Sequence, residues 1–194
     1  MQTLALYFSP GSSSMAPHIA LHEIGAPFES RPISLAKKEN RTAAFLALNP
    51  EGKVPLLLID GRPLTEVAAI LLYLAKTFPD VGLLPEDLET QAQVVSWMSF
   101  VASTVHPARR QGADHARGVY AIAEHRLGSR EWAVGRYSIA DIHLFRLFWR
   151  FSNSLELSRT EFPNLFAHYD RMMARPAVQR TLEIEGSIGY ELPA

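Results

Sequence analysis

Cysteine is absent from the 194 residues of the chain. This absence excludes disulfide bonds, thiolate metal ligands, a cysteine nucleophile and any chemistry through an enzyme mixed disulfide. An excess of charge of one sign is also missing, since 19 Lys and Arg face 20 Asp and Glu and the formal net charge is −1. The balance gives no reason to expect a nucleic-acid or anionic-membrane partner.

Long hydrophobic runs are absent as well. The longest, Val67 to Leu74, is far too short to cross a bilayer. The first residues, MQTLALYF, show no basic region, no long apolar stretch and no small-residue cleavage site, so we expect no signal peptide. A cytoplasmic location without membrane attachment is therefore expected.

The first part of the chain has the pattern of a small α/β domain. A strand is predicted over 3–8, a helix over 14–25 and an edge-like second strand over 27–33. The polar stretch KKENRTAAFLALNPEG is expected to be a loop. A hairpin over 56–64, with Asp-Gly at its turn, and an apolar helix over 65–78 complete the domain.

The rest of the chain shows only helical patterns. They cover residues 89–108, 113–127, 138–152 and 163–184. Residues 79–88, PDVGLLPEDL, are rich in Pro, Gly and Asp and are interpreted as a linker. The predicted organisation is an α/β domain over 1–78, the linker over 79–88 and an all-helical domain over 89–194.

Three serines, Ser12 to Ser14, separate the first strand from the first helix. One serine is enough to cap a helix, and Ser14 is the plausible N-cap. A second hydroxyl at a helix N-terminus can donate a hydrogen bond to an anion, such as the thiolate of a bound molecule. The plainer alternative, one capping serine beside two loop serines, is favoured for any single serine.

Thr65-Glu66-Val67 begins the apolar helix over 65–78. Its unpaired N–H groups form an anion site, and the carboxylate of Glu66 can hold an ammonium group. A ligand with an amino-acid end would be bound through both charges. The alternative treats Thr65 as an N-cap and Glu66 as a first-turn acid, and it is favoured without further context.

Three further motifs allow a functional and a structural interpretation. Val54-Pro55 precedes a buried strand, so the bond is either cis at a turn or an ordinary trans proline. His18 and His22 lie one turn apart, but a third metal ligand is not evident and a partly buried histidine pair is favoured over a metal site. The sequence from Ser138 to Asp141 has the form of a capping box, a stability element.

Five stretches in order carry a family resemblance: YFSPGSSSMAPHIAL, NPEGKVPLLLIDG, LTEVAAILLYLA, WMSFVASTVHP and WAVGRYSIADIHLF. Together they resemble the cytosolic glutathione transferases, most closely the bacterial beta-like group. The resemblance implies a thioredoxin-like N-terminal domain, an all-α C-terminal domain and a homodimer. It implies an enzyme that binds glutathione as co-substrate, needs no metal and presents the thiolate to a small hydrophobic electrophile, a detoxification reaction.

The resemblance assigns roles to residues at the first helix. Ser13 stands where beta-like relatives carry a cysteine that faces the glutathione sulfur, which leaves Ser14 as the capping residue. Phe8 stands where the family has a tyrosine, and Tyr7 is expected on the opposite strand face. Ser13 is therefore the predicted hydroxyl for the thiolate.

The resemblance also assigns glutathione contacts. Val54 and Pro55 match the cis-proline pair that binds the cysteinyl backbone, and Glu66 matches the acid that binds the γ-glutamyl group. Val67 replaces a serine or glycine, so its backbone N–H is the group left for the carboxylate. Lys38 and Lys53 fall in regions that reach the carboxylates of the tripeptide. His106 matches a histidine of the helical domain that lines the site, and together with Ser13 it is a predicted catalytic residue.

A rival hypothesis is a dimeric binding or scaffolding module with the transferase fold and no activity. Phe8 and Val67 favour it, as does Pro107, which follows His106 where a basic residue is common. Glutathione binding, and a lowered pKa of the bound thiol, distinguish the enzyme from this module.

Overall fold

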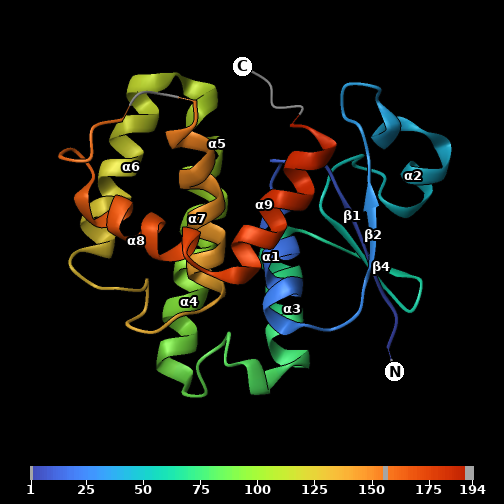
Figure 1. Ribbon diagram of the computed structural model, residues 1–194, viewed down its shortest axis with the longest axis horizontal. Helices are drawn as coiled ribbons and strands as arrows, with labels where there is room; N and C mark the ends of the chain where they lie inside the picture. The colour runs from blue at the N-terminus through green and yellow to red at the C-terminus, as the bar shows by residue number, and fades with distance from the viewer. Residues whose placement is uncertain (1, 155–156, 191–194) are drawn as a thin grey trace. The chain divides into compact units, whose positions relative to one another are not determined.

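A computed structural model describes residues 2–154 and 157–190. Its contacts divide the chain into two compact units (Figure 1). The first unit contains the residues up to Thr77 and those from Pro176 onward, and the second is Phe78–Arg175. None of the helices in the described part of the chain is long and apolar enough to cross a membrane.

The first unit is built on a mixed four-stranded sheet with the order β2-β1-β3-β4. β2 runs parallel to β1, while β3 is antiparallel to both β1 and β4. The strands are β1 (Leu4–Phe8), β2 (Glu29–Pro32), β3 (Leu56–Ile59) and β4 (Arg62–Thr65). Among the described residues, four α-helices belong to this unit: α1 (Met15–Ile24), α2 (Ala43–Leu48), α3 (Val67–Thr77) and α9 (Pro176–Ile188).

The register of the sheet aligns three strand ends. Tyr7, near the end of β1, pairs with Leu56 at the start of β3, and Leu56 pairs with Thr65 at the end of β4. Because these pairings are antiparallel, the turn after β1, the segment before β3 and the residue after β4 lie at one end of the sheet.

The two faces of the sheet have different cores. Successive residues of a strand point to opposite faces, so Leu6 and Phe8 share the face covered by α1, where both are fully buried. Ala5 and Leu58 lie on the other face and pack with Phe45 of α2. Figure 1 shows α1 and α3 on one side of the sheet and α2 on the other.

The predicted elements of the α/β domain are confirmed except for one. The predicted strands over 3–8 and 27–33 form, and 27–33 is an edge strand. The hairpin over 56–64 also forms, and its turn residues Asp60 and Gly61 both have a positive φ, 49° and 79°. Such a turn matches the twist of the two strands and favours an Asp-Gly pair.

The stretch expected to be a loop contains α2, so that prediction is wrong. Thr42 caps the helix, because its hydroxyl accepts a hydrogen bond from the amide of Phe45 at 3.3 Å. Phe45 is then buried against the sheet. One capped turn and one buried aromatic side chain are enough to form a helix of six residues.

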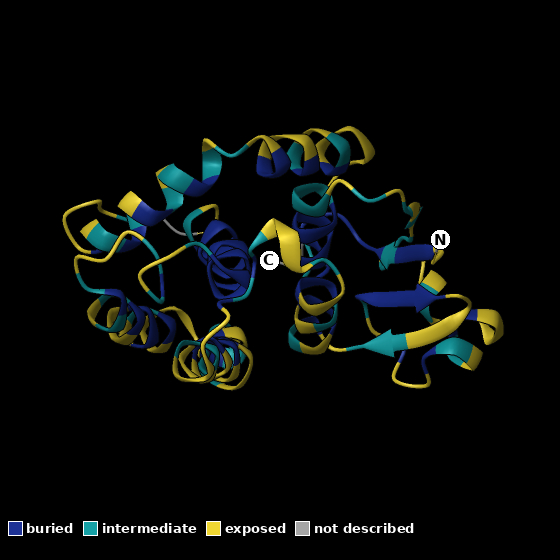
Figure 2. Ribbon diagram, turned by 90° about the horizontal axis from the view of Figure 1, so that it is seen from below, coloured by how far each residue is buried: buried dark blue, intermediate teal, exposed yellow. Residues whose placement is uncertain are grey.

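The second unit is helical throughout its regular structure in the described residues. α7 is central, with residues 139–151 buried on every side (Figure 2). A π-helical turn, Val101–Val105, interrupts the predicted helix over 89–108, because Pro107 lacks an N–H and cannot continue the α-helical hydrogen bonds. The α-helices are α4 (Leu88–Phe100), α5 (His106–Ala108), α6 (Ala113–Leu127), α7 (Ile139–Ser152) and α8 (Pro163–Met173).

The helix predicted over 163–184 is two helices. α8 ends at Met173, and α9 begins at Pro176, which lacks the N–H that a continuous helix would use. α9 packs against α1. The last helix thus belongs to the first unit, although the sequence pattern groups it with the helical domain.

The capping box of α7 forms as predicted and has additional partners. Both the amide and the hydroxyl of Ser138 donate to Oδ2 of Asp141, at 2.9 and 3.1 Å. Oδ1 of Asp141 accepts from the amide of Ala133 at 2.7 Å and contacts Nε2 of His168 at 3.1 Å. Asp141 is fully buried, so it connects the helix start to two other segments of the unit.

Asp141→Ala is expected to lower the free energy of unfolding by about 3 kcal/mol, because the change leaves several buried polar groups unpaired. Chemical denaturation measures the loss. Asp170→Ala is the control, since Asp170 pairs with Arg159 on the surface and its loss costs at most about 1 kcal/mol. Equal losses in the two variants would contradict the structural role of Asp141.

Candidate active site at the end of the sheet

The turn after β1 is held by hydrogen bonds among its own residues. The amide of Ser12 donates to the carbonyl of Ser9 at 3.0 Å, which closes a turn with Gly11 at φ 71°. Ser14 Oγ accepts from the amide of Ser9 at 3.1 Å and donates to the carbonyl of Ser9 at 3.2 Å. Ser12 Oγ lies 2.6 Å from Ser14 Oγ.

These contacts correct the prediction that Ser14 caps α1. Ser14 occupies the N-cap position, but its hydroxyl accepts no hydrogen bond from the helix amides. It is fully buried and binds the end of β1 instead. The side chain therefore connects the strand to the helix.

Ser13 is the serine that reaches the neighbouring loop. It is half-buried, and its hydroxyl donates to the carbonyl oxygen of Val54 at 3.2 Å. The Val54-Pro55 bond is cis, as predicted. Within the turn, the amides of Ser12 and Met15 donate to the carbonyls of Ser9 and Ser12, and the amide of Ser14 donates to Ser12 Oγ.

The two aromatic residues of β1 do not offer a phenol to this turn. Phe8 is fully buried, and its ring centroid lies 4.6 Å from that of His18. Tyr7 lies on the opposite face, as predicted, where its ring packs edge-on against Phe45 and its hydroxyl accepts from Arg31 at 2.8 Å. The hydroxyl that contacts the backbone before the cis proline is that of Ser13.

Glu66 lies between β4 and α3 in a left-handed conformation, with φ 71°. Its carbonyl accepts a hydrogen bond from the amide of Ile70 at 2.9 Å, so Glu66 immediately precedes the first turn of α3. The side chain of Glu66 is exposed. The alternative with Thr65 as N-cap is wrong, since Thr65 is the last residue of β4. A non-glycine residue at positive φ is strained, and such strain is typical of functional sites.

The loop before β3 is organised by Asn49, a residue that the sequence analysis missed. Asn49 is buried; its side-chain amide donates to the carbonyl of Lys53 at 2.8 Å, and its Oδ1 accepts from the amide of Glu51 at 3.2 Å. The neighbouring Asn40 donates to the carbonyl of Gly52 at 2.7 Å. The Asn-Pro pair at the loop start is the turn signal that could have revealed it.

The side chains of the two predicted lysines are exposed and do not belong to this buried network. Lys38 is exposed and has φ 57°, and Lys53 is exposed with its ammonium 2.6 Å from the carboxylate of Glu51. His106 belongs to the second unit, where it is exposed at the start of α5. The sheet end therefore brings together Ser13, Val54 and the Glu66-Val67 backbone.

His18 and His22 form a histidine pair in the first unit, with ring centroids 4.9 Å apart. Nδ1 of the fully buried His18 contacts the carboxylate of Glu185 at 2.8 Å. Burial, together with the charges of His18 and Arg180, lowers the pKa of His22 to about 4. Within the described residues no group of three or more His, Asp or Glu side chains could hold a metal ion.

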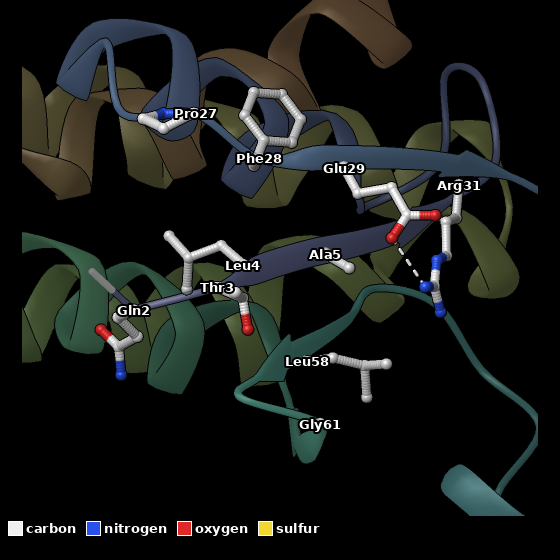
Figure 3. A pocket seen from close by; sticks show the side chains of 10 residues that line it. All are labelled: Gln2, Thr3, Leu4, Ala5, Pro27, Phe28, Glu29, Arg31, Leu58 and Gly61. Atoms are coloured by element: carbon white, nitrogen blue, oxygen red, sulfur yellow. Dashed lines mark hydrogen bonds and ion pairs between the residues drawn. The ribbon is translucent and has the colours of Figure 1, made fainter.

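A hollow of about 550 Å³ lies at the other end of β1 (Figure 3). It is lined by residues such as Thr3, Phe28 and Leu58, and its charged groups, Glu29 and Arg31, pair with each other at 2.6 Å. Its position and its paired charges separate it from the Ser13 site.

Three features together define a class of proteins. They are a thioredoxin-like sheet unit with a helical unit, the serine turn after β1 and the cis proline before β3. Two family models match the chain: "Glutathione S-transferase, N-terminal domain" over residues 2–76 and "Glutathione S-transferase, C-terminal domain" over residues 95–176. The chain therefore belongs to the glutathione S-transferase family, as predicted.

Individual relatives agree with this assignment. Glutathione S-transferase GstA of Escherichia coli O157:H7 is 34% identical over 201 residues, which cover 94% of this chain and 99% of the relative. The structure of a sphingomonad glutathione S-transferase complexed with glutathione has a TM-score of 0.85 and 35% identity, covering 94% and 98% of the two chains. A beta-class enzyme from Sphingomonas chungbukensis has a TM-score of 0.82 and 35% identity over the same shares.

The names of these relatives favour the enzyme over the non-catalytic module. GST-4.5 of Xanthomonas campestris, a further glutathione S-transferase, is 32% identical and covers 94% of this chain and 99% of its own length. The predicted enzyme class, a glutathione S-transferase, is thereby confirmed.

Ser14→Ala is expected to lower the free energy of unfolding by about 2 kcal/mol, because the amide and carbonyl of Ser9 lose a buried partner. Thermal or chemical denaturation measures the change. Ser103→Ala is the matched control: its hydroxyl donates to the carbonyl of Ser99 within a helix and is exposed, so the change stays within about 0.5 kcal/mol. A Ser14 variant as stable as the Ser103 variant would refute the connecting role.

Proposed function

We propose that the protein binds glutathione at the end of the sheet and presents its thiolate to a small hydrophobic electrophile. The observation that carries the proposal is the hydrogen bond from Ser13 Oγ to the carbonyl of Val54. It brings a hydroxyl at the start of a helix within reach of the backbone before the cis proline. A thiol held there would face both the hydroxyl and the positive end of the helix dipole.

Binding would exchange one hydrogen bond for another. The cysteinyl N–H of glutathione donates to the carbonyl of Val54, which now accepts from Ser13 at 3.2 Å. The Ser13 hydroxyl then turns to the sulfur and donates to the thiolate. A free thiol has a pKa of about 8.5, and a lower value increases the fraction of nucleophile at neutral pH.

The two ends of the tripeptide would be bound separately. The carboxylate of Glu66 receives the γ-glutamyl ammonium, and the N–H of Val67 at the start of α3 receives the adjacent carboxylate. The left-handed backbone of Glu66 supports this role, because it costs free energy that a purely structural residue would not need. Lys38 and Lys53 attract the glycyl carboxylate.

The remaining parts of the proposal concern the second substrate and the assembly. His106, exposed in the helical unit, acts as a second catalytic residue, and the active protein is a cytoplasmic homodimer that acts on a small hydrophobic electrophile in detoxification. The family assignment supports these statements about the second substrate and the assembly. The relative solved with bound glutathione supports the proposal that this protein binds glutathione.

Ser13→Ala is expected to raise the pKa of the bound glutathione thiol, by about 1 unit for each 1.4 kcal/mol of lost preference for the thiolate. The conjugation rate at neutral pH falls with the thiolate fraction. Ultraviolet absorbance of the thiolate, titrated against pH in the complex, measures the shift.

Ser13→Cys is the companion variant, since a thiol is close in size and the fold should tolerate it. An unchanged titration and rate in Ser13→Ala would assign thiolate stabilisation to the helix N-terminus or His106. If the unmodified protein does not bind millimolar glutathione, the proposal as a whole fails.

Glu66→Ala is expected to weaken glutathione binding by about 1.5–3 kcal/mol, the contribution of a hydrogen bond between charged groups, without unfolding the protein. Calorimetry measures the affinity, and circular dichroism checks the fold. Glu89→Ala removes another exposed glutamate, in α4 of the second unit, and should leave the affinity unchanged. Equal affinity in both variants would show that the γ-glutamyl end lies elsewhere.

A further inference from the structure

The turn that carries Ser13 is also held by a hydrogen bond to α9. Oε2 of Glu185, on α9, accepts a hydrogen bond from the amide of Gly11 at 2.7 Å. The other oxygen, Oε1, contacts Nδ1 of His18 at 2.8 Å. Glu185 and His18 are both fully buried. Each oxygen of the Glu185 carboxylate therefore has a buried partner within the first unit.

The geometry of the turn explains why the Gly11 amide needs an acceptor. The hydrogen bond that closes the turn uses the amide of Ser12, so the amide of Gly11 points out of the turn. Gly11 is buried, and a buried backbone N–H without a partner costs free energy. A carboxylate is the strongest acceptor that a protein side chain offers for it.

His18 keeps the carboxylate in place. Its ring is packed by aromatic neighbours, with centroid distances of 4.6 Å to Phe8, 4.9 Å to His22 and 5.8 Å to Phe28. A ring confined in this way fixes the direction of Nδ1 and therefore the position of the carboxylate of Glu185. The Gly11 amide is thus bound to a rigid group.

We propose that Glu185 is a positioning residue for thiolate stabilisation. By fixing Gly11, it fixes the hydroxyl of Ser13 two residues later, and Glu185 itself need not touch glutathione. The assignment rests on the proposed function of Ser13. It acts through geometry and not through charge, because a hydroxyl must keep its distance and direction to the sulfur in order to donate, and a loose turn would lose both.

Three substitutions separate geometry from charge. Glu185→Ala removes the acceptor. Glu185→Gln removes the charge but keeps a carbonyl oxygen for the Gly11 amide, while its NH₂ group can donate to Nδ1 of His18. Glu185→Asp keeps the charge but is one methylene shorter, which withdraws the carboxylate from Gly11.

The control is Thr181→Ala, one turn earlier on α9. Thr181 is fully buried, and its hydroxyl donates within the helix to the carbonyl of Ala177 at 2.8 Å. Its loss weakens the packing of α9 without removing the bond to Gly11. It therefore reports what general destabilisation of this helix does to the active site.

The test is the pKa of the bound glutathione thiol in each variant, measured by ultraviolet titration, with the amide proton shift of Gly11 read by NMR in ligand-free protein. Glu185→Ala and Glu185→Asp should raise the thiol pKa by about 1 unit, a tenfold loss of thiolate at pH values well below it. Glu185→Gln and Thr181→Ala should titrate like the unmodified protein. If Glu185→Ala does not fold, the thiol pKa measured with Glu185→Asp tests the proposal.

Three results would overturn the assignment. They are a normal titration in Glu185→Asp despite a shifted Gly11 amide signal, a shift in Glu185→Gln as large as in Glu185→Asp, and an equal shift in Thr181→Ala. Failure of the proposed function looks different, because the unmodified protein would then bind no glutathione.

Discussion

The hydrogen-bond register between β1, β3 and β4 determines which loops of this protein meet. The alignment of Tyr7 with Leu56, and of Leu56 with Thr65, places three chain segments far apart in sequence at one end of the sheet. A shift of one residue would also exchange the two faces, moving Phe8 out of the core below α1. The site therefore depends on the same packing that stabilises the sheet.

At that end of the sheet the hydroxyls of the three consecutive serines have different partners. The hydroxyl of Ser14 hydrogen-bonds the backbone of Ser9 at the end of β1, and the hydroxyl of Ser12 hydrogen-bonds the hydroxyl of Ser14. Only Ser13 directs its hydroxyl across to the loop before β3. The hydrogen bonds on both sides of Ser13 restrict where its hydroxyl can lie, as its proposed role beside the glutathione sulfur requires.

The sequence predicts whatever depends on local pattern. The strands, the hairpin with Asp60-Gly61, α1, α3 and α6 all follow from periodicity and turn chemistry, and the cis proline follows from the family resemblance. The sequence pattern fails for an element too short to be periodic, such as the six residues of α2, and for a side chain with a choice of partners, as Ser14 has between the amides of α1 and Ser9. It also fails where a contact between distant residues decides, since Glu185 resembles a surface glutamate until α9 packs against α1.

The return of α9 to the first unit has a consequence for biosynthesis. The sheet, α1 and α3 leave the ribosome first, but the helix that packs on α1 and supplies Glu185 is translated after the entire second unit. The second unit is one continuous segment and can complete its core during translation. The order of completion is therefore the reverse of the order of synthesis, and a nascent chain gains the finished turn around Gly11 and Ser13 only after α9 has been synthesised.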